Sequence, residues 1–270
     1  MDDQKHIRIL IAESCSVSRL VAAKHLEKAG YTADIVDNGR QVLETIQSKN
    51  YALLLMDIQM PVMDGYDVSR AIRKMEKEKS IAAIGNHLPI IAMVDYADEE
   101  HLAGCYAAGM DDCLAKPLRK DNLLAMIKKW VPRNPPENAI PCCNPATSKT
   151  SDRHASQSPS TMNMERALAE FDGNWTFLKG VFSEFFKQVH QQLSLIVEAI
   201  NRGDTETIRA QAHSIKGGAA NLTADSLAKL AIDLETRGKT GDLDDAQEIV
   251  RQMENIIQQL KISVDEFRTI

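Results

Sequence analysis

Short apolar runs alternate with amphipathic stretches along the first half of the chain. The runs have the length of buried strands and span residues 7–12, 32–36, 51–56, 89–94 and 112–115. Between them, apolar residues recur at helical spacing near 16–29, 38–49, 66–79, 98–108 and 120–130. Buried strands that alternate with helices predict a parallel sheet covered on both faces. We therefore expect an α/β doubly wound domain with a five-stranded parallel sheet over residues 1–131.

The second half of the chain has a helical pattern throughout. One apolar stripe runs along residues 174–200, through Leu178, Val181, Phe182, Phe185, Val189, Leu193, Ile196 and Ile200. Similar stripes occupy 204–220, 223–237 and 242–267, and a short segment at 164–171 precedes them. Stripes at this spacing are core-facing sides of helices. They predict an all-α four-helix bundle over residues 164–270.

Six of the nine prolines lie between Pro132 and Pro159, in a stretch that is rich in Ser, Asn and Thr. This composition predicts a flexible linker over 132–163. A linker of that length has a typical span on the order of 30 Å, so we expect loosely tethered domains. Transfer between the domains of one chain is then allowed by geometry but not dictated by it.

Composition excludes several classes of protein. The 270 residues are 44% hydrophobic and 26% charged, and the net charge of -6 leaves no basic footprint for nucleic acid. We find no apolar run of the roughly 18 residues that a membrane span needs, and no signal peptide. The five cysteines form no CxxC pair, which favours a reducing, cytoplasmic location.

Candidate chemistry lies at the carboxyl ends of the predicted strands, where ligands collect in such sheets. Glu13 follows the first strand, Asp57 the third and Lys116 the fifth, so all three should converge at one edge. Carboxylates hold Mg²⁺ through oxygen, and a lysine neutralises phosphoryl oxygens. Spacing alone leaves open the alternative that these are ordinary polar loop residues.

Two motifs narrow the assignment of the first domain to a family. "LLLMDIQMPVMDGYDVSRAIR" and "AGMDDCLAKPL" resemble the receiver domain of two-component response regulators, which has a flavodoxin-like fold. The resemblance implies that Asp57 is the phospho-acceptor and that Lys116 contacts the phosphoryl group. It also implies a Mg²⁺ ion held by Glu13, Asp57 and the backbone carbonyl of Gln59.

The chain departs from the receiver pattern at three positions. Ser14 replaces a second acidic residue, Val94 replaces a Thr or Ser whose hydroxyl would bond the phosphoryl group, and Cys113 replaces an aromatic residue. We expect weak Mg²⁺ binding and a degenerate receiver. Asp95 adds a carboxylate that either repels phosphate or partly replaces the lost metal ligand, and both alternatives stay open.

The second candidate site is the helix that contains "AHSIKGGAANL". On a helical projection its core sector contains Ile208, Ala212, Ile215 and Ala219. His213 points about 130° away from the centre of that sector, and we expect it to face solvent. Its neighbours at helical spacing include Arg209, Lys216 and Gly217. Cations suit a phosphoryl group, and Gly217 leaves room for a docking protein.

This motif, followed by "LAKLAIDLE", resembles the histidine phosphotransfer domain of phosphorelays. The resemblance implies that His213 takes a phosphoryl group from an aspartyl phosphate and passes it on. Lys216 and Gly217 carry over as the supporting lysine and the clearance glycine. The whole arrangement resembles the C-terminal part of hybrid sensor kinases, whose partners are sensor histidine kinases and other receiver domains.

The sequence supports neither a phosphate-binding loop nor an ATP-binding kinase region. The stretch "RGKTGD" lacks the first glycine of a phosphate-binding loop, because residue 233 is Asp, and Gly238 is better explained as a helix C-cap. No ATP-binding kinase region is evident, so we expect a phosphotransfer protein and not an enzyme. Two hypotheses remain: a phosphorelay carrier that uses both Asp57 and His213, or a receiver that only docks while His213 serves other receivers.

Overall fold

The computed structural model describes residues 7–78, 87–95, 99–131 and 162–267. The predicted linker lies almost wholly outside these ranges, and the domain boundaries 1–131, 132–163 and 164–270 stay predictions. None of the described helices combines the length and the apolar content that a bilayer crossing requires.

The described part of the first domain contains a five-stranded parallel sheet. Its strands are β1 (Arg8–Ala12), β2 (Thr32–Val36), β3 (Leu53–Asp57), β4 (Ile90–Val94) and β5 (Asp112–Ala115), in the order β2-β1-β3-β4-β5. The helices are α1 (Ser16–Lys28), α2 (Gly39–Ser48), α3 (Gly65–Lys77), α4 (Glu99–Ala107) and α5 (Lys120–Trp130). This is the doubly wound α/β fold that the apolar runs predicted.

Alternating side chains of each strand pack on opposite faces of the sheet. In β1, Ile9 and Ile11 belong to the apolar cluster that also contains residues of α1 and α5. Leu10 and Ala12 belong to the cluster with residues of α2, α3 and α4. Successive strand residues point to opposite faces, and helices on both faces explain why β3 and β4 are buried at every position.

The register of the sheet brings the functional strand ends to one edge. Ala12 of β1 pairs with Met56 of β3, and Asp57 pairs with Met93 of β4. Val94 in turn pairs with Ala115, the residue before Lys116. Because the strands are parallel and their ends are aligned by this register, Glu13, Asp57 and Lys116 lie at the same edge of the sheet.

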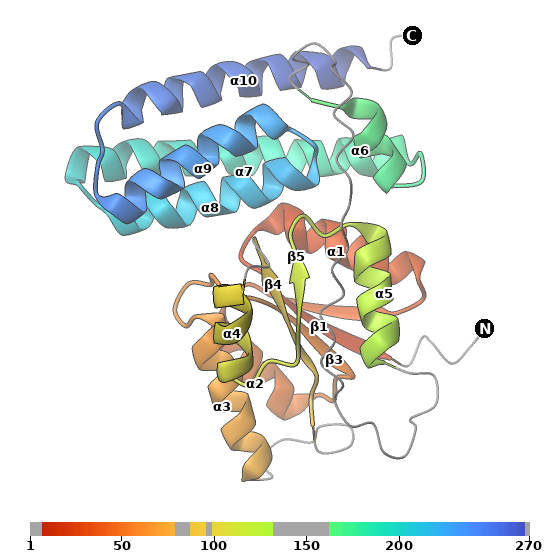
Figure 1. Cartoon of the computed structure of the whole chain (residues 1–270). Coiled ribbons are helices and arrows are strands. Elements are labelled where there is room, and N and C mark those ends of the chain that lie inside the picture. The colour runs from red at the N-terminus through yellow and green to blue at the C-terminus, as the bar shows by residue number, and fades with distance from the viewer. Residues whose placement is uncertain (1–6, 79–86, 96–98, 132–161, 268–270) are drawn as a thin grey trace.

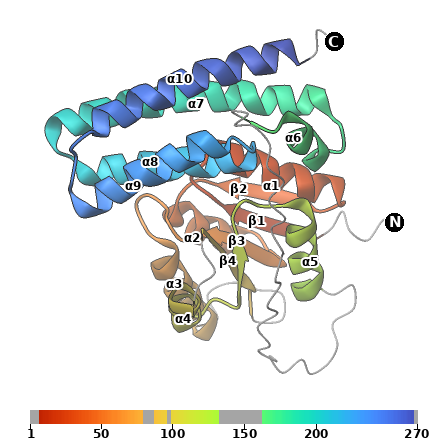
Figure 2. The ribbon, with the colours of Figure 1, turned by 45° about the horizontal axis from the view of Figure 1, so that its top comes forward.

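The second domain is a helical bundle with a short preceding helix. Its elements are α6 (Met164–Glu170), α7 (Trp175–Arg202), α8 (Thr205–Asn221), α9 (Asp225–Thr240) and α10 (Ala246–Glu266) (Figure 2). The side chains of Asn174 and Asp204 accept hydrogen bonds from backbone N–H groups in the first turns of α7 and α8, so each helix begins at a capping residue. Gly203 ends α7 in the left-handed conformation (φ 67°).

Gly238 is not the C-cap that the sequence suggested. Helix α9 continues to Thr240, and Gly241 ends it at φ 78°. A Cβ atom on Gly238 would lie 2.9 Å from two backbone atoms of α8, the nitrogen of Arg209 and the oxygen of Thr205. Gly238 therefore serves close packing between α8 and α9.

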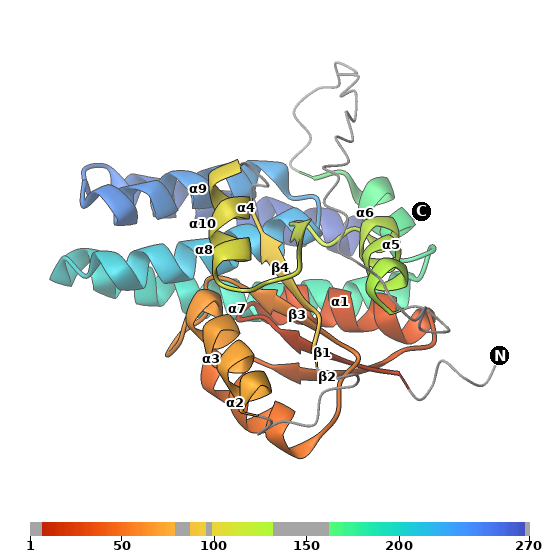
Figure 3. The ribbon, with the colours of Figure 1, turned by 60° about the horizontal axis from the view of Figure 1, so that its bottom comes forward.

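The two domains pack against each other, although the sequence predicted only a loose tether. The bundle lies across the carboxyl ends of the strands, and α1 runs beside α7 and α8 (Figures 1 and 3). Val17 and Val21 of α1 belong to the apolar cluster of the bundle, whereas Ala22 and Leu26 face the sheet. One helix thus contributes to two cores.

Candidate functional site

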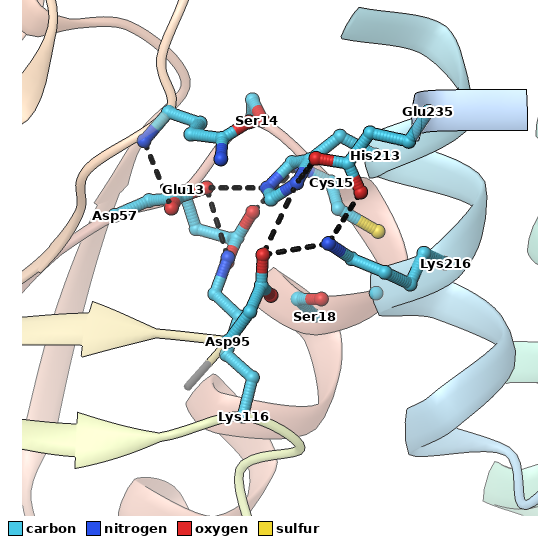
Figure 4. Close-up of polar contacts among 12 residues, drawn as sticks. Glu13, Ser14, Cys15, Ser18, Asp57, Asp95, Lys116, His213, Lys216 and Glu235 are labelled. Atoms are coloured by element: carbon cyan, nitrogen blue, oxygen red, sulfur yellow. Dashed lines mark hydrogen bonds and ion pairs between the residues drawn. The ribbon is translucent and has the colours of Figure 1, made fainter. Parts of the chain in front are cut away.

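Three charged groups meet at the carboxyl edge of the sheet. The ammonium of Lys116 lies 2.9 Å from Oε2 of Glu13 and 2.9 Å from Oδ2 of Asp57 (Figure 4). Both carboxylates are 1% exposed. The sequence-based expectation that these residues converge agrees with this geometry, since the sheet register aligns their strands.

Backbone groups hold the remaining carboxylate oxygens. Oδ1 of Asp57 accepts a hydrogen bond from the backbone N–H of Gln59 at 3.2 Å, and Oε1 of Glu13 accepts one from the N–H of Cys15 at 2.9 Å. Each carboxylate is therefore fixed at one oxygen by the loop that follows its own strand, and the other oxygen faces Lys116.

Burial and the neighbouring Glu13 raise the pKa of Asp57 to about 7, even though Lys116 lowers it. Burial also opposes ionisation of Glu13, but the Lys116 ammonium brings the pKa of Glu13 below its usual value. Burial opposes the charge of Lys116 as well, yet Asp57 and Glu13 raise its pKa. One cation thus neutralises two buried carboxyl groups incompletely.

This cluster fits a magnesium ion. Oε2 of Glu13 and Oδ2 of Asp57 are buried and have no hydrogen-bond partner among the described residues, apart from their ion pairs with Lys116. Hard carboxylate and carbonyl oxygens are the ligands that Mg²⁺ prefers. Glu13, Asp57 and the backbone carbonyl of Gln59 would hold the ion.

The three departures from the receiver pattern lie in or just after strands β1, β4 and β5. Ser14 follows Glu13, and its carbonyl oxygen accepts a hydrogen bond from Arg19. Val94 ends β4 and is 3% exposed, with only apolar atoms in its side chain. Cys113 is half-buried beside the cluster of α2, α3 and α4. Ser14 lacks the negative charge of the acidic residue that the receiver pattern has there, and Val94 lacks the hydroxyl of the expected Thr or Ser.

His213 of α8 lies directly over Asp57. Its Nε2 atom is 4.0 Å from Oδ2 of Asp57, and its Nδ1 atom is 3.3 Å from Oε1 of Glu235. Nδ1 is also 3.4 Å from Oδ2 of Asp95. The side chain turns away from the bundle core, as the helical projection indicated. It does not face solvent, however, because the first domain covers it and leaves it 6% exposed.

Lys216, one turn along α8, joins the two domains. Its ammonium lies 2.6 Å from Oδ2 of Asp95 and 2.6 Å from Oε2 of Glu235. Burial opposes its charge, but Asp95 raises the pKa of Lys216. Burial likewise opposes the ionisation of both carboxyl groups. The His213 and Lys216 side chains nevertheless hold the pKa values of Asp95 and Glu235 below their usual range.

Potential ligand atoms of Asp95, His213 and Glu235 lie within 4.8 Å of one another. Three such groups could hold a metal ion. Asp95 belongs to the first domain, whereas His213 and Glu235 belong to the bundle. Lys216 contacts both carboxylates, so the cluster joins the two domains through ion pairs.

The other predicted residues of α8 also face the first domain. Arg209 donates a hydrogen bond to the side-chain oxygen of Gln59 at 3.1 Å and pairs with Glu206. A Cβ atom on Gly217 would lie 3.5 Å from Oγ of Ser18 in α1, which is ordinary van der Waals contact. Gly217 therefore lies where helix α1 approaches α8, and its role as a clearance glycine stays a prediction.

Sequence reasoning missed Glu235 and left the role of Asp95 undecided. Glu235 lies four residues after Ala231, on the core-facing side of α9, and is 3% exposed. The sequence signal that could have identified Glu235 is a carboxylate at the edge of the apolar stripe of α9. Both residues line a cavity of about 220 Å³ between the domains, together with Asp57, Gln59 and His213.

Comparisons with known proteins match one family in each half of the chain. Residues 9–128 match the family model of the response regulator receiver domain, and residues 180–263 match that of the Hpt domain. The chain therefore contains an N-terminal receiver domain and a C-terminal Hpt domain, which are domains of phosphorelay signal transduction.

Several relatives share one or both domains. The aerobic respiration control sensor protein ArcB of Escherichia coli (strain K12) is 27% identical over 248 residues, which is 92% of this chain and 30% of that protein. The hybrid signal transduction protein dokA of Dictyostelium discoideum is 39% identical over 123 residues, 46% of this chain and 7% of that protein. The chain thus spans less than a third of the length of these relatives.

Solved structures similar to this chain cover the receiver. The receiver domain of the sensor histidine kinase PA1611 from Pseudomonas aeruginosa is 33% identical, with a TM-score of 0.41, and covers 46% of this chain and 96% of that one. That structure has a magnesium ion in its active-site cleft. A co-crystal structure of Ypd1 and the Ssk1 receiver domain from Saccharomyces cerevisiae is 23% identical, with a TM-score of 0.43, and covers 46% of this chain and 88% of that one.

Proposed function

We propose that the chain performs one step of a phosphorelay, in which a phosphoryl group passes between Asp57 and His213 of the same molecule. The observation that carries the proposal is the distance of 4.0 Å between Nε2 of His213 and Oδ2 of Asp57. The attacking nitrogen and the departing oxygen are thus already held close together, so the transfer of a phosphoryl group between them needs little further ordering.

In the forward direction the phosphoryl group starts on Asp57. The lone pair of His213 Nε2 forms the new N–P bond, the P–O bond to Asp57 breaks, and its electron pair stays on the carboxylate. The ammonium of Lys116, 2.9 Å away, neutralises that carboxylate. The proton on Nδ1 stays in place and faces Glu235. The reverse transfer follows the same path.

A bound Mg²⁺ ion would add positive charge beside the phosphoryl oxygens, because the ion is the largest local charge in such a site. We expect the affinity for Mg²⁺ to be low, since Ser14 offers no carboxylate. We also expect no ATP-dependent kinase activity, and we expect sensor kinases and other receivers as partners.

The second hypothesis, a receiver that only docks, is less well supported. Glu13, Asp57 and Lys116 form an intact charged cluster in the receiver, and a histidine of the Hpt domain faces it. A surface used only for docking would not need a buried carboxylate opposite that histidine. We infer a cytoplasmic location from the cysteine usage of the sequence, because five cysteines without a CxxC pair are typical of a reducing compartment.

The test is site-resolved labelling of the full chain. Radiolabelled acetyl phosphate with Mg²⁺ should give acid-labile label on the wild type, and this label should disappear in both Asp57→Asn and His213→Gln. His190→Gln is the matched control, because His190 is an exposed histidine of α7. Acid-labile label that persists in His213→Gln would contradict the assignment of the histidine, and label that persists in Asp57→Asn would contradict the route.

A further inference from the structure

Asp95 belongs to the receiver, yet its carboxylate contacts the Hpt domain. It follows β4 directly, and its Oδ2 atom lies 2.6 Å from Nζ of Lys216 and 3.4 Å from Nδ1 of His213. Its side chain is only 18% exposed in the docked arrangement. Figure 4 shows the carboxylate between the two Hpt side chains.

We propose that Asp95 is a positioning and specificity residue, by which the receiver recognises the Hpt histidine and orients it for transfer. The inference rests on the proposed exchange between Asp57 and His213. It adds a receiver residue that acts on the histidine only while the domains are docked.

The orientation of His213 follows from the surroundings of its two ring nitrogens. Nδ1 faces two carboxylates, Glu235 at 3.3 Å and Asp95 at 3.4 Å, so it is the nitrogen that carries the proton. The other nitrogen, Nε2, then has its lone pair free and faces Asp57. Fixing the tautomer through the hydrogen bond at the far nitrogen is how proteins set which histidine nitrogen reacts.

The two carboxylates differ in when they act. Glu235 comes from α9 of the same domain and accompanies His213 whether or not a receiver is docked. Asp95 arrives only with the receiver. As Nε2 bonds to phosphorus, the ring gains positive charge, and a second carboxylate beside Nδ1 stabilises it. Docking therefore completes the environment of the histidine.

Specificity follows from the pairing with Lys216. A receiver without an acidic side chain directly after its fourth strand would leave Lys216 with Glu235 as its carboxylate partner. It would also place an uncharged group against a buried ammonium. The Hpt domain should therefore favour receivers that carry a carboxylate at this place, because a missing partner weakens a buried charged contact.

The test compares the full chain with Asp95→Asn and Asp95→Glu. Asp172→Asn is the matched control. Asp172 pairs with Lys28 and Lys120 of the receiver, so this substitution removes interdomain ion pairs that lie away from His213. Two quantities are measured: the ¹⁵N chemical shifts of the His213 ring in unphosphorylated chains, and the rate of label transfer to His213 divided by the amount of phospho-Asp57.

Asp95→Asn should move the ring resonances of His213 and lower the normalised transfer rate by about tenfold or more, the scale of a lost hydrogen bond to a charged group. Asp95→Glu should recover part of both effects. Asp172→Asn should leave the ring resonances in place. The proposal is overturned if Asp95→Asn keeps the wild-type resonances and rate, or if it slows transfer no more than Asp172→Asn does with the ring unmoved.

The orienting role of Asp95 and the exchange between Asp57 and His213 can be rejected separately. The ring resonances are read without any phosphoryl group, so they report on Asp95 even if no transfer occurs. Label that never reaches His213 in the wild type, while Asp95→Asn still moves the ring signals, would reject the exchange between Asp57 and His213 and retain the orienting role of Asp95.

Discussion

Nε2 of His213 and Oδ2 of Asp57 lie 4.0 Å apart, although the two residues belong to different domains. Both side chains are buried in this arrangement, at 6% and 1% exposure. The docked arrangement therefore suits exchange between Asp57 and His213 of one chain, and it keeps other proteins away from both residues. A sensor kinase or a second receiver can reach either residue only after the domains separate.

His25 should make this docking sensitive to pH. It lies in α1, is 1% exposed, and stacks on Phe171 of the second domain with ring centroids 5.6 Å apart. Neither ring nitrogen has a hydrogen-bond partner among the described residues. Burial lowers its pKa below 6.5, while Glu170 acts in the opposite direction and Lys120 adds to the effect of burial.

Because the docked state keeps His25 neutral, its contribution to docking is fully present above a pH of about 6.5 and is lost as the pH falls through the lowered pKa. Small-angle X-ray scattering of the full chain should show a rising radius of gyration on acidification from about pH 8 to about pH 5.5. His25→Leu should flatten this response, and the exposed His190→Gln should not. An unchanged pH response in His25→Leu would count against the account.

Gly238 should be intolerant of any side chain. A Cβ atom there would meet backbone atoms of α8 at 2.9 Å, and backbone cannot move aside as a flexible side chain can. Gly238→Ala should lower the free energy of unfolding by about 1–3 kcal/mol, as overpacking does. The matched control is Gly180→Ala in α7, where a Cβ atom meets nothing within 4 Å, and urea unfolding of both variants would measure the difference. Equal effects would refute the close-packing role.

Gly217 should affect docking more than stability. Gly217→Ala places its Cβ at 3.5 Å from Ser18 and should stabilise α8 by up to about 1 kcal/mol. Gly217→Gln should push α1 away and slow transfer to His213. Gly218→Ala is the internal comparison, since its Cβ would press on Phe185 at 3.0 Å inside the bundle. Wild-type transfer by Gly217→Gln would show that clearance at this position is unimportant.

The receiver should gain reactivity when its missing groups are restored. Ser14→Asp should tighten Mg²⁺ binding, because it adds a carboxylate beside Glu13. Adding Val94→Thr should raise the yield of phospho-Asp57, since a hydrogen bond to a charged group is worth about 1.5–3 kcal/mol. Calorimetry measures the first effect and acetyl phosphate labelling the second. If the wild type already labels as fast as a receiver with all family residues, the losses at Ser14 and Val94 do not weaken the receiver.

The receiver fold could be predicted from sequence because each strand is a short buried run. The strand at 112–115 was predicted at its observed bounds, and the convergence of Glu13, Asp57 and Lys116 followed from their positions after the strands of a parallel sheet. The end of α9 was misjudged at Gly238, because glycine at a helix end and glycine at a close helix contact look the same in sequence.

The docking of the domains could not be predicted in the same way. Val17 and Val21 of α1 read as part of an ordinary amphipathic helix, yet they face the bundle while Ala22 and Leu26 face the sheet. The sequence signal for this docking was that α1 has apolar residues on two faces. The helical projection placed His213 outside the bundle core, but it could not say that another domain covers it.

The central claim is that the phosphoryl group moves between Asp57 and His213 of one chain, and the concentration dependence of that step tests it most directly. After brief labelling with radioactive acetyl phosphate, the first-order rate at which label moves from phospho-Asp57 to His213 is measured over about a hundredfold range of protein concentration. We predict a rate that does not change with concentration, and little transfer from His213→Gln chains to Asp57→Asn chains mixed at the same concentration. A rate that rises in proportion to protein concentration, matched by the mixed variants, would contradict the account.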